Sequence, residues 1–289
     1  KEKELNNLIM SSKLGWKAVY FTDDTQLGGF THLFKFKDGK VDMASDFDND
    51  TSIQSSEYDI ILGSTVILVF TTKNRIHLLS DSNSFPVASL RGKGYLGDFQ
   101  FLYYGQENGE IIFRTSRSFK EVRFVKAKAT DWTDLAQSRL MIPNVVGAST
   151  RPLFRLLEIN DGTKISQFDF AFTSTSRFAT SNSIETGSSV TNNIGIAYTP
   201  TGIIVSPPVK VGTQSLSEFT FDAATGSFNA IGTSGVSASI RYSSKPLVIT
   251  DDYKILLNPN QQLVYAYIYN LTNTAPTNSP LFTSLLLFS

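Results

Sequence analysis

The acidic stretch from Asp46 to Glu57 contains the side chains whose types and spacing come nearest to a metal site. Aspartates occupy its first, third and fifth positions (Asp46, Asp48 and Asp50), and Glu57 occupies its twelfth. Carboxylate oxygens at these positions are the ligands of an EF-hand calcium loop. The spacing therefore supports the hypothesis of a calcium site at Asp46, Asp48, Asp50 and Glu57, with Ca²⁺ as the one candidate cofactor.

Two features of the same stretch favour a solvated acidic loop instead. Its sixth position is Thr51, where the sharp turn of a calcium loop requires glycine. The segments on either side alternate apolar and polar residues as β-strands do, whereas an EF-hand loop lies between helices. Both interpretations stay open.

Three tyrosines near the C-terminus form a second candidate site. Tyr265, Tyr267 and Tyr269 alternate with apolar residues, so they face one side of a predicted strand. Exposed, they would stack against a sugar ring or a peptide; buried, they would belong to the core with their hydroxyls at its rim. Alternating aromatics are more commonly core residues. We name the three as candidate ligand-binding residues.

Side chains for catalysis or transition-metal binding are sparse. The chain has no cysteine, which excludes disulfides, thiolate ligands and cysteine nucleophiles. His32 and His77 lie in segments that we interpret as apolar strands, where a structural histidine is the ordinary finding. No GxSxG elbow and no glycine-rich phosphate loop before a helix occurs. We predict no catalytic residues, and a glycosidase with acids drawn from loops stays as an alternative.

The charge balance bears on the partners. Lysine plus arginine and aspartate plus glutamate number 26 each, so the formal net charge is zero. This removes the electrostatic argument for nucleic acid or an anionic membrane as partner. A basic run spaces its charges three apart, which on strands sends neighbours to opposite faces and leaves a solvated surface or an anionic glycan contact as interpretations. The run comprises Arg114, Arg117, Lys120, Arg123, Lys126 and Lys128.

The overall composition predicts a folded, mainly β protein. Apolar residues make up 41% and aromatic residues 12% of the 289 residues, and turns rich in Ser, Thr and Asn are frequent. This mixture favours strands over helices, and the length favours two domains. No apolar run approaches the roughly 20 residues that span a bilayer.

The first half reads as a helix followed by an antiparallel meander. Leu5, Leu8 and Ile9 have helical spacing, and Gly15 suits the helix end. Asp38-Gly39 and Asn108-Gly109 predict tight hairpin turns. Such a meander closes best into a small, lipocalin-like barrel. The predicted strands are residues 16–20, 30–37, 41–45, 58–62, 65–72, 75–80, 98–105, 110–115 and 119–128.

The second half reads as another antiparallel β domain. A helix capped at Thr130 or Asp131 and ended before Pro143 marks the junction. The predicted domains are therefore residues 1–130, a linking helix and loop at 131–150, and residues 151–289. The predicted strands are residues 152–159, 164–173, 194–198, 202–205, 219–222, 227–231 and 263–271, with a last core strand at the C-terminus.

Several segments together resemble one family of proteins. They are Gly15-Trp16 after a short helix, Gly28-Gly29-Phe30, the hairpin at 34–48, Ser56-Glu57-Tyr58, residues 76–81 before 92–101, and residues 196–212. This set is similar to secreted lipoproteins from Bacteroidetes-type bacteria, an uncharacterised family known as domain of unknown function 4302. The resemblance spans most of the chain and contains no catalytic motif.

The resemblance implies a location and partners, but no reaction. Such proteins are lipid-anchored outside the cytoplasm, at the outer-membrane surface or in the periplasm, beside TonB-dependent importers and SusD-like binding proteins. Residue 1 is Lys and not Met, so we expect a trimmed chain that would reach a membrane only through an N-terminal lipid anchor absent from it.

Three functions follow as hypotheses. The first is a non-catalytic cell-surface lipoprotein that binds a glycan or peptide ligand, or a partner, in an outer-membrane nutrient-uptake system. The second is a secreted hydrolase that acts on glycans. The third is a structural subunit that docks on a larger complex.

Overall fold

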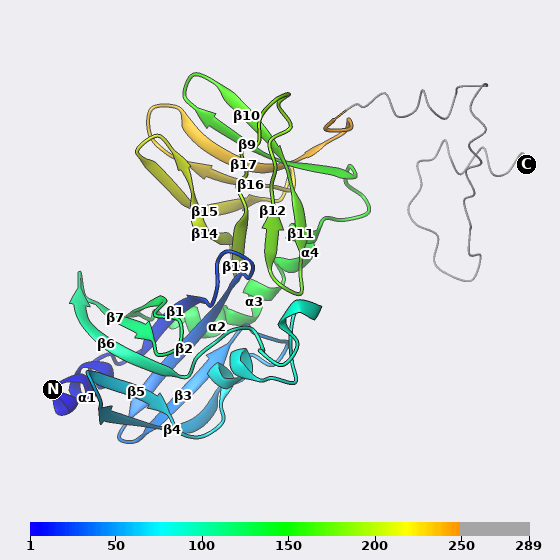
Figure 1. Cartoon of the computed structure of the whole chain (residues 1–289). Helices are drawn as coiled ribbons and strands as arrows, with labels where there is room; N and C mark the ends of the chain where they lie inside the picture. Colours follow the sequence, from blue (N-terminus) through cyan, green and yellow to red (C-terminus); the bar gives the residue numbers. More distant parts are fainter. Residues whose placement is uncertain (249–289) are drawn as a thin grey trace, which may run out of the picture.

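The computed structural model describes residues 1–248, which form a closed barrel and a nine-stranded sheet. Figure 1 shows the barrel at the bottom and the sheet above it. In the barrel each strand pairs antiparallel with the next, and β1 pairs with β8, which confirms the predicted meander. Its strands are β1 (Trp16–Phe21), β2 (Gly29–Lys37), β3 (Lys40–Ser45), β4 (Gln54–Leu62), β5 (Val66–Phe70), β6 (Gln100–Glu107), β7 (Glu110–Thr115) and β8 (Glu121–Lys126).

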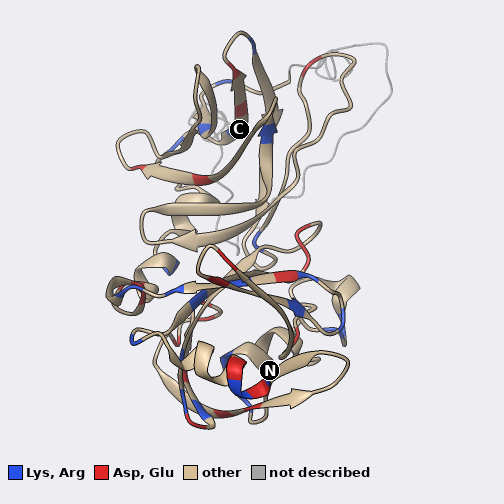
Figure 2. Cartoon of the chain, turned by 90° about the vertical axis from the view of Figure 1, so that its left-hand side faces the viewer, with Lys and Arg blue, Asp and Glu red and all other residues tan. Residues whose placement is uncertain are grey.

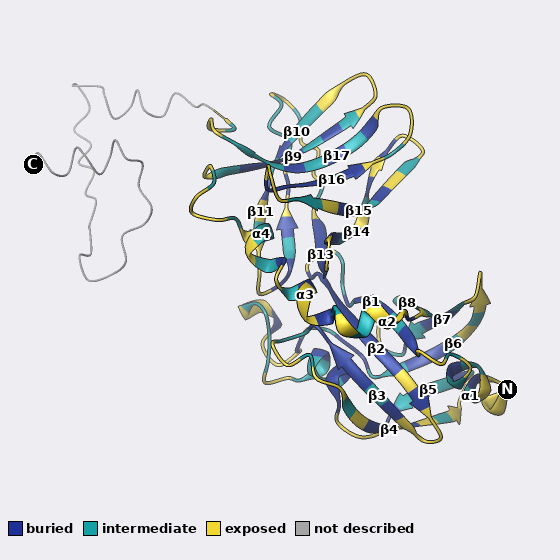
Figure 3. Cartoon of the chain, turned by 180° about the vertical axis from the view of Figure 1, so that it is seen from behind, coloured by how far each residue is buried: buried dark blue, intermediate teal, exposed yellow. Residues whose placement is uncertain are grey.

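Aromatic side chains fill the interior of the barrel. Phe34 stacks on Phe124 with ring centroids 4.6 Å apart and on Phe70 at 5.5 Å. Phe101 and Phe113 are fully buried in the same core. Figure 3 shows buried residues along the barrel strands and exposed residues at the turns. The interior of the barrel is therefore occupied by side chains.

One end of the barrel is closed by helix α1 (Glu2–Met10). Leu5 and Ile9 on this helix are fully buried against the barrel core. The Trp16 indole donates to the carbonyl of Ile9 at 2.7 Å, and the Tyr58 hydroxyl donates to the Asn6 side chain at 2.8 Å. We call the opposite end the junction end. It consists of residues 22–28, 46–53, 71–99 and 116–120, which connect alternate pairs of strands.

The second half of the described chain forms one curled antiparallel sheet with its own core. Its strand order is β10-β9-β17-β16-β15-β14-β13-β12-β11. A bridge between Phe168 and Ser183 joins β10 to the segment after β12, which brings the two sides of the sheet together. The strands are β9 (Phe154–Asp161), β10 (Ile165–Asp169), β11 (Ala171–Thr173), β12 (Phe178–Thr180), β13 (Ile194–Thr199), β14 (Gly202–Val211), β15 (Gln214–Asp222), β16 (Ser227–Ile231) and β17 (Val236–Ser243).

Three short helices connect the barrel to the sheet, where the sequence predicts one. They are α2 (Ala129–Thr133), α3 (Leu135–Arg139) and α4 (Ile142–Val146). Asp134 leaves helical geometry at φ −99° and ψ 1°, and Pro143 stands in the first turn of α4, where its missing N–H costs nothing. No helix in residues 1–248 is long and apolar enough to cross a membrane. The predicted domain boundaries stay a prediction.

The structure corrects the strand predictions: residues 164–173, predicted as one strand, form β10 and β11 at the two edges of the sheet. Residues 75–80, predicted as a strand, form the 3₁₀ helix η1 (Arg75–Ser80), and a second 3₁₀ turn, η2 (Ala88–Leu90), follows. Asn74 accepts from the Ile76 N–H at 3.1 Å, and the His77 ring accepts from the Asn74 N–H at 3.2 Å, so side-chain caps replace a strand ladder. Strand β17 was not predicted, although Val236, Ala238 and Ile240 alternate with polar residues as in a half-buried strand.

Candidate functional site

The turn between β11 and β12, residues 174–177, inserts into the junction end of the barrel. The carbonyl of Ser176 accepts from the Gly28 N–H at 2.8 Å, and the carbonyl of Arg177 accepts from the Ile196 N–H at 2.8 Å. Arg177 is 3% exposed and has φ of 52°, which is uncommon for a residue with a Cβ. The turn therefore lies between backbone of the barrel and backbone of the sheet.

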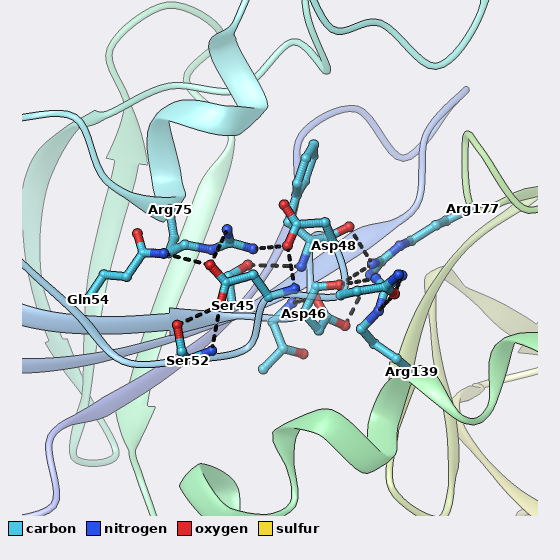
Figure 4. Close-up of polar contacts among 12 residues, drawn as sticks. Ser45, Asp46, Asp48, Ser52, Gln54, Arg75, Arg139 and Arg177 are labelled. Carbon is cyan, nitrogen blue, oxygen red and sulfur yellow. Dashed lines mark hydrogen bonds and ion pairs between the residues drawn. The ribbon is translucent and has the colours of Figure 1, made fainter.

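The guanidinium of Arg177 forms a buried ion pair with Asp46. It donates to Asp46 Oδ2 at 3.1 Å, to the Asp46 carbonyl at 2.5 Å and to the Gly29 carbonyl at 2.9 Å. It also lies over the rings of Phe30 and Tyr198, at 4.1 and 4.7 Å from their centroids. Asp46 has no exposed surface, and its other carboxylate oxygen accepts from a barrel N–H. Figure 4 shows this pair.

Two further arginines surround the same acidic loop (Figure 4). Arg75 from η1 is 4% exposed and donates to Asp48 Oδ1 at 2.5 Å. Arg139 from α3 donates to the Asp46 carbonyl at 2.7 Å and to Asn49 Oδ1 at 2.9 Å. The loop between β3 and β4 is thus held by arginines from η1, α3 and the β11–β12 turn.

The structure does not gather the four predicted calcium ligands. Asp46 and Asp48 face arginines, and the carboxylate of Asp50 accepts from the nearby Ser52 and Gln54. Glu57 pairs with Lys40 at the other end of β3, which at about 3.3 Å per residue is far from Asp46. Residues 1–248 contain no group of three or more acidic or histidine side chains that could hold a metal ion. Calcium binding stays a prediction, and we derive no chemistry from it.

The two histidines have structural environments. His32 is fully buried near Arg75 and Arg177. Its Nδ1 lies 3.3 Å from the Phe30 carbonyl oxygen, and its Nε2 has no hydrogen-bond partner in the described residues. Burial, together with the positive charges of Arg75 and Arg177, lowers the pKa of His32 to about 3. His77 lies in η1 and stacks on Phe99, with centroids 4.6 Å apart.

A cleft of about 600 Å³ opens at the junction end of the barrel. Three separate segments form it: residues 22–23 after β1, residues 80–97, and the β7–β8 turn at 117–120. The polar side chains among its lining residues come from Thr22, Asp23, Ser80, Ser82, Lys93, Arg117, Ser118 and Lys120. The sequence analysis singled out the basic run that includes Arg117 and Lys120, but not its meeting with residues 22–23 and 80–97.

The cleft wall is linked to the second sheet. Lys120 and Asp24 form an ion pair at 2.9 Å, and Asp24 accepts from the Ser206 hydroxyl on β14 at 2.8 Å. Burial alone would raise the pKa of Asp24, but the hydrogen bonds from Lys120 and Ser206 outweigh it and lower the pKa. The candidate tyrosines lie outside the described residues; they are Tyr265, Tyr267 and Tyr269.

The fold and the cleft define a class of mainly β proteins, a packed barrel joined to a curled sheet with a polar hollow at one barrel end. The family model described as Domain of unknown function (DUF4302) matches residues 1–223, more than half of the chain, so the chain belongs to this family. The match ends between β15 and β16. A comparison with curated proteins finds no match.

Replacing Arg177 should destabilise the protein strongly. In Arg177→Met the carboxylate of Asp46 stays buried without its cation, so the free energy of unfolding should fall by about 3–5 kcal/mol. Urea denaturation measures this. Arg123→Met, which breaks exposed ion pairs with Glu107 and Glu121, is the control and should cost about 1 kcal/mol or less. Adding Asp46→Asn to Arg177→Met should restore part of the lost free energy of unfolding, because it removes the unpaired buried charge. An equal loss in Arg177→Met and Arg123→Met would contradict a structural role of the Asp46–Arg177 ion pair.

The buried His32 should make stability depend on pH. Between pH 6.5 and pH 5 the unfolded chain protonates this ring and the folded chain does not, since its folded pKa is about 3. The free energy of unfolding should therefore fall as the pH falls, by at most about 1.4 kcal/mol per pH unit. His32→Gln should flatten this slope in urea denaturation, and the half-buried His77→Gln should flatten it less. An unchanged slope in His32→Gln would contradict a ring kept neutral.

Proposed function

We propose that this protein is a non-catalytic binding protein that takes a polar ligand in the cleft at the junction end of the barrel. The observation that carries the proposal is the cleft itself, a hollow of about 600 Å³ built from three separate segments. Its size falls within the range of about 300–1,000 Å³ of small-molecule sites. The aromatic filling of the barrel supports an end site over an interior one.

The chemistry of the lining favours binding over hydrolysis. Asp23 is the one carboxylate among the lining residues, whereas glycoside hydrolysis uses two. The lining serines have no histidine beside them in the cleft that could act as a general base. The carboxylate of Asp23 accepts from Thr25 and Gln26, and these hydrogen bonds outweigh burial and lower its pKa, which suits a structural acid.

The proposal includes a place for the protein. The resemblance to secreted lipoproteins supports a lipid-anchored protein outside the cytoplasm, on the outer membrane of a Bacteroidetes-type bacterium. There it would serve a nutrient-uptake system beside a TonB-dependent importer and SusD-like proteins. The pairing of a ligand cleft with a second β structure suits such an accessory, because one part can bind ligand and the other a partner.

Filling the cleft should abolish ligand binding. We expect a thermal-shift screen of neutral and acidic mono- and disaccharides and dipeptides to yield a ligand, whose affinity calorimetry then measures. Ser118→Trp places an indole in the cleft and should weaken that ligand at least about tenfold, a loss of about 1.4 kcal/mol. Ser189→Trp, on an exposed turn of the second sheet, is the control and should bind normally. Equal affinity for both variants would place the ligand elsewhere.

The native full-length protein should carry a lipid. Metabolic labelling with a palmitate analogue should mark it, and cell fractionation should recover it with the outer membrane, because a diacyl anchor holds a protein there stably. A cytoplasmic, unlabelled protein would contradict this location.

A further inference from the structure

We propose that the ligand of the cleft carries an anionic group, a carboxylate or a sulfate, which Arg117 and Lys93 hold with Lys120 beside them. This inference rests on the proposed function, because it names the ligand class of the same cleft. It goes beyond that function by assigning the residues that select the ligand.

The cleft concentrates positive charge that the chain as a whole does not have. Lys93, Arg117 and Lys120 line it, against the single carboxylate of Asp23. Over the whole chain the numbers of basic and acidic residues are equal, and Figure 2 shows both kinds intermixed along the barrel. A concave wall with one sign of charge raises the local concentration of ligands of the opposite sign.

Two of these cations have no carboxylate partner within residues 1–248. Lys120 is paired with Asp24 at 2.9 Å, and Asp23 is already the acceptor for Thr25 and Gln26. No ion pair of Lys93 or Arg117 occurs among the described residues, although other exposed arginines, such as Arg123, have several. Within the described part of the chain, no carboxylate therefore competes with a ligand for Lys93 or Arg117.

Contacts with Asp98 and Phe99 hold Arg117 in position. The buried carboxylate of Asp98 accepts from the Arg117 N–H at 2.9 Å and from the Phe99 N–H at 2.8 Å. The guanidinium lies over the Phe99 ring, 5.9 Å from its centroid. A side chain held by its backbone and by a ring loses less entropy on binding than a free one. The planar guanidinium can then donate two parallel hydrogen bonds to a carboxylate or sulfate.

Residues with hydroxyl groups also line the cleft. Thr22 lines it, is 1% exposed, and its buried hydroxyl has no hydrogen-bond partner in the described residues. Ser80, Ser82 and Ser118 add three more hydroxyls around the cations. An unpartnered buried hydroxyl is costly, so a ligand or a ligand-bound water that accepts or donates there is favoured. This arrangement suits a polar ligand with an acidic group at one end.

Calorimetry with three probes tests the inference: glucuronate, glucose 6-sulfate and neutral glucose. At least one of the anionic probes should bind at least about tenfold more tightly than glucose, and added salt should weaken it. Arg117→Gln should reduce the affinity for that anion about tenfold and leave glucose unaffected. Arg114→Gln, which replaces an arginine stacked on Tyr104 outside the cleft, is the matched control and should bind like wild type.

The outcomes separate this inference from the proposed function. If neutral ligands bind in the cleft and are lost in Ser118→Trp, but neither anion exceeds glucose, the anionic ligand class is wrong and the binding function stands. If an anion binds equally to Arg117→Gln and wild type, the assignment of Arg117 is wrong. If no probe and no compound of the screen binds, both proposals fail.

Discussion

The ion pair between Asp46 and Arg177 is almost completely buried, and the arrangement of the two β structures depends on it. Neither charge would be stable alone at this depth, because an unpaired buried charge costs several kcal/mol. The β11–β12 turn and the β3–β4 loop therefore have to meet in the one arrangement that pairs these two charges. The backbones of the barrel and the sheet also approach so closely that only glycine fits at two positions. A Cβ on Gly28 would lie 2.3 Å from the Arg177 carbonyl oxygen, and a Cβ on Gly195 would lie 2.4 Å from the Leu27 carbonyl oxygen. The buried ion pair and the close backbone contacts at Gly28 and Gly195 thus favour the same placement of the sheet against the barrel.

This constraint also shapes the cleft. The residues that line it belong to the barrel, but the pair between Lys120 and Asp24 continues to Ser206 on β14. The sheet therefore supports the β7–β8 turn through Lys120, and Asp98 holds the same turn through the N–H of Arg117. A site with its walls held before ligand arrives loses little entropy on binding. In the proposed function, the second β structure would support the binding site in this way, although none of the residues that line the cleft belongs to it.

Patterns within short stretches of the sequence predicted most of the fold. The alternation along β2 and the turns at Asp38-Gly39 and Asn108-Gly109 indicated the barrel, because burial of one strand face has a period of two. The site depends instead on contacts between distant segments. Asp46 pairs with an arginine 131 residues away, and its spacing to the other acids of its own stretch gives no sign of that partner. The caps of η1 and the alternation along β17 are local by contrast, and a reading of short stretches could have found both.

The pairing of β9 with β17 has a consequence for biosynthesis. These two strands are the first and last of the described sheet in the chain, yet they are neighbours over the whole length of β17. Because a ribosome releases the chain from its N-terminus, the barrel can close once Lys126 has emerged, while β9 keeps an open edge until Ser243 follows. During that interval a chaperone or export machinery would encounter a finished barrel attached to an incomplete sheet.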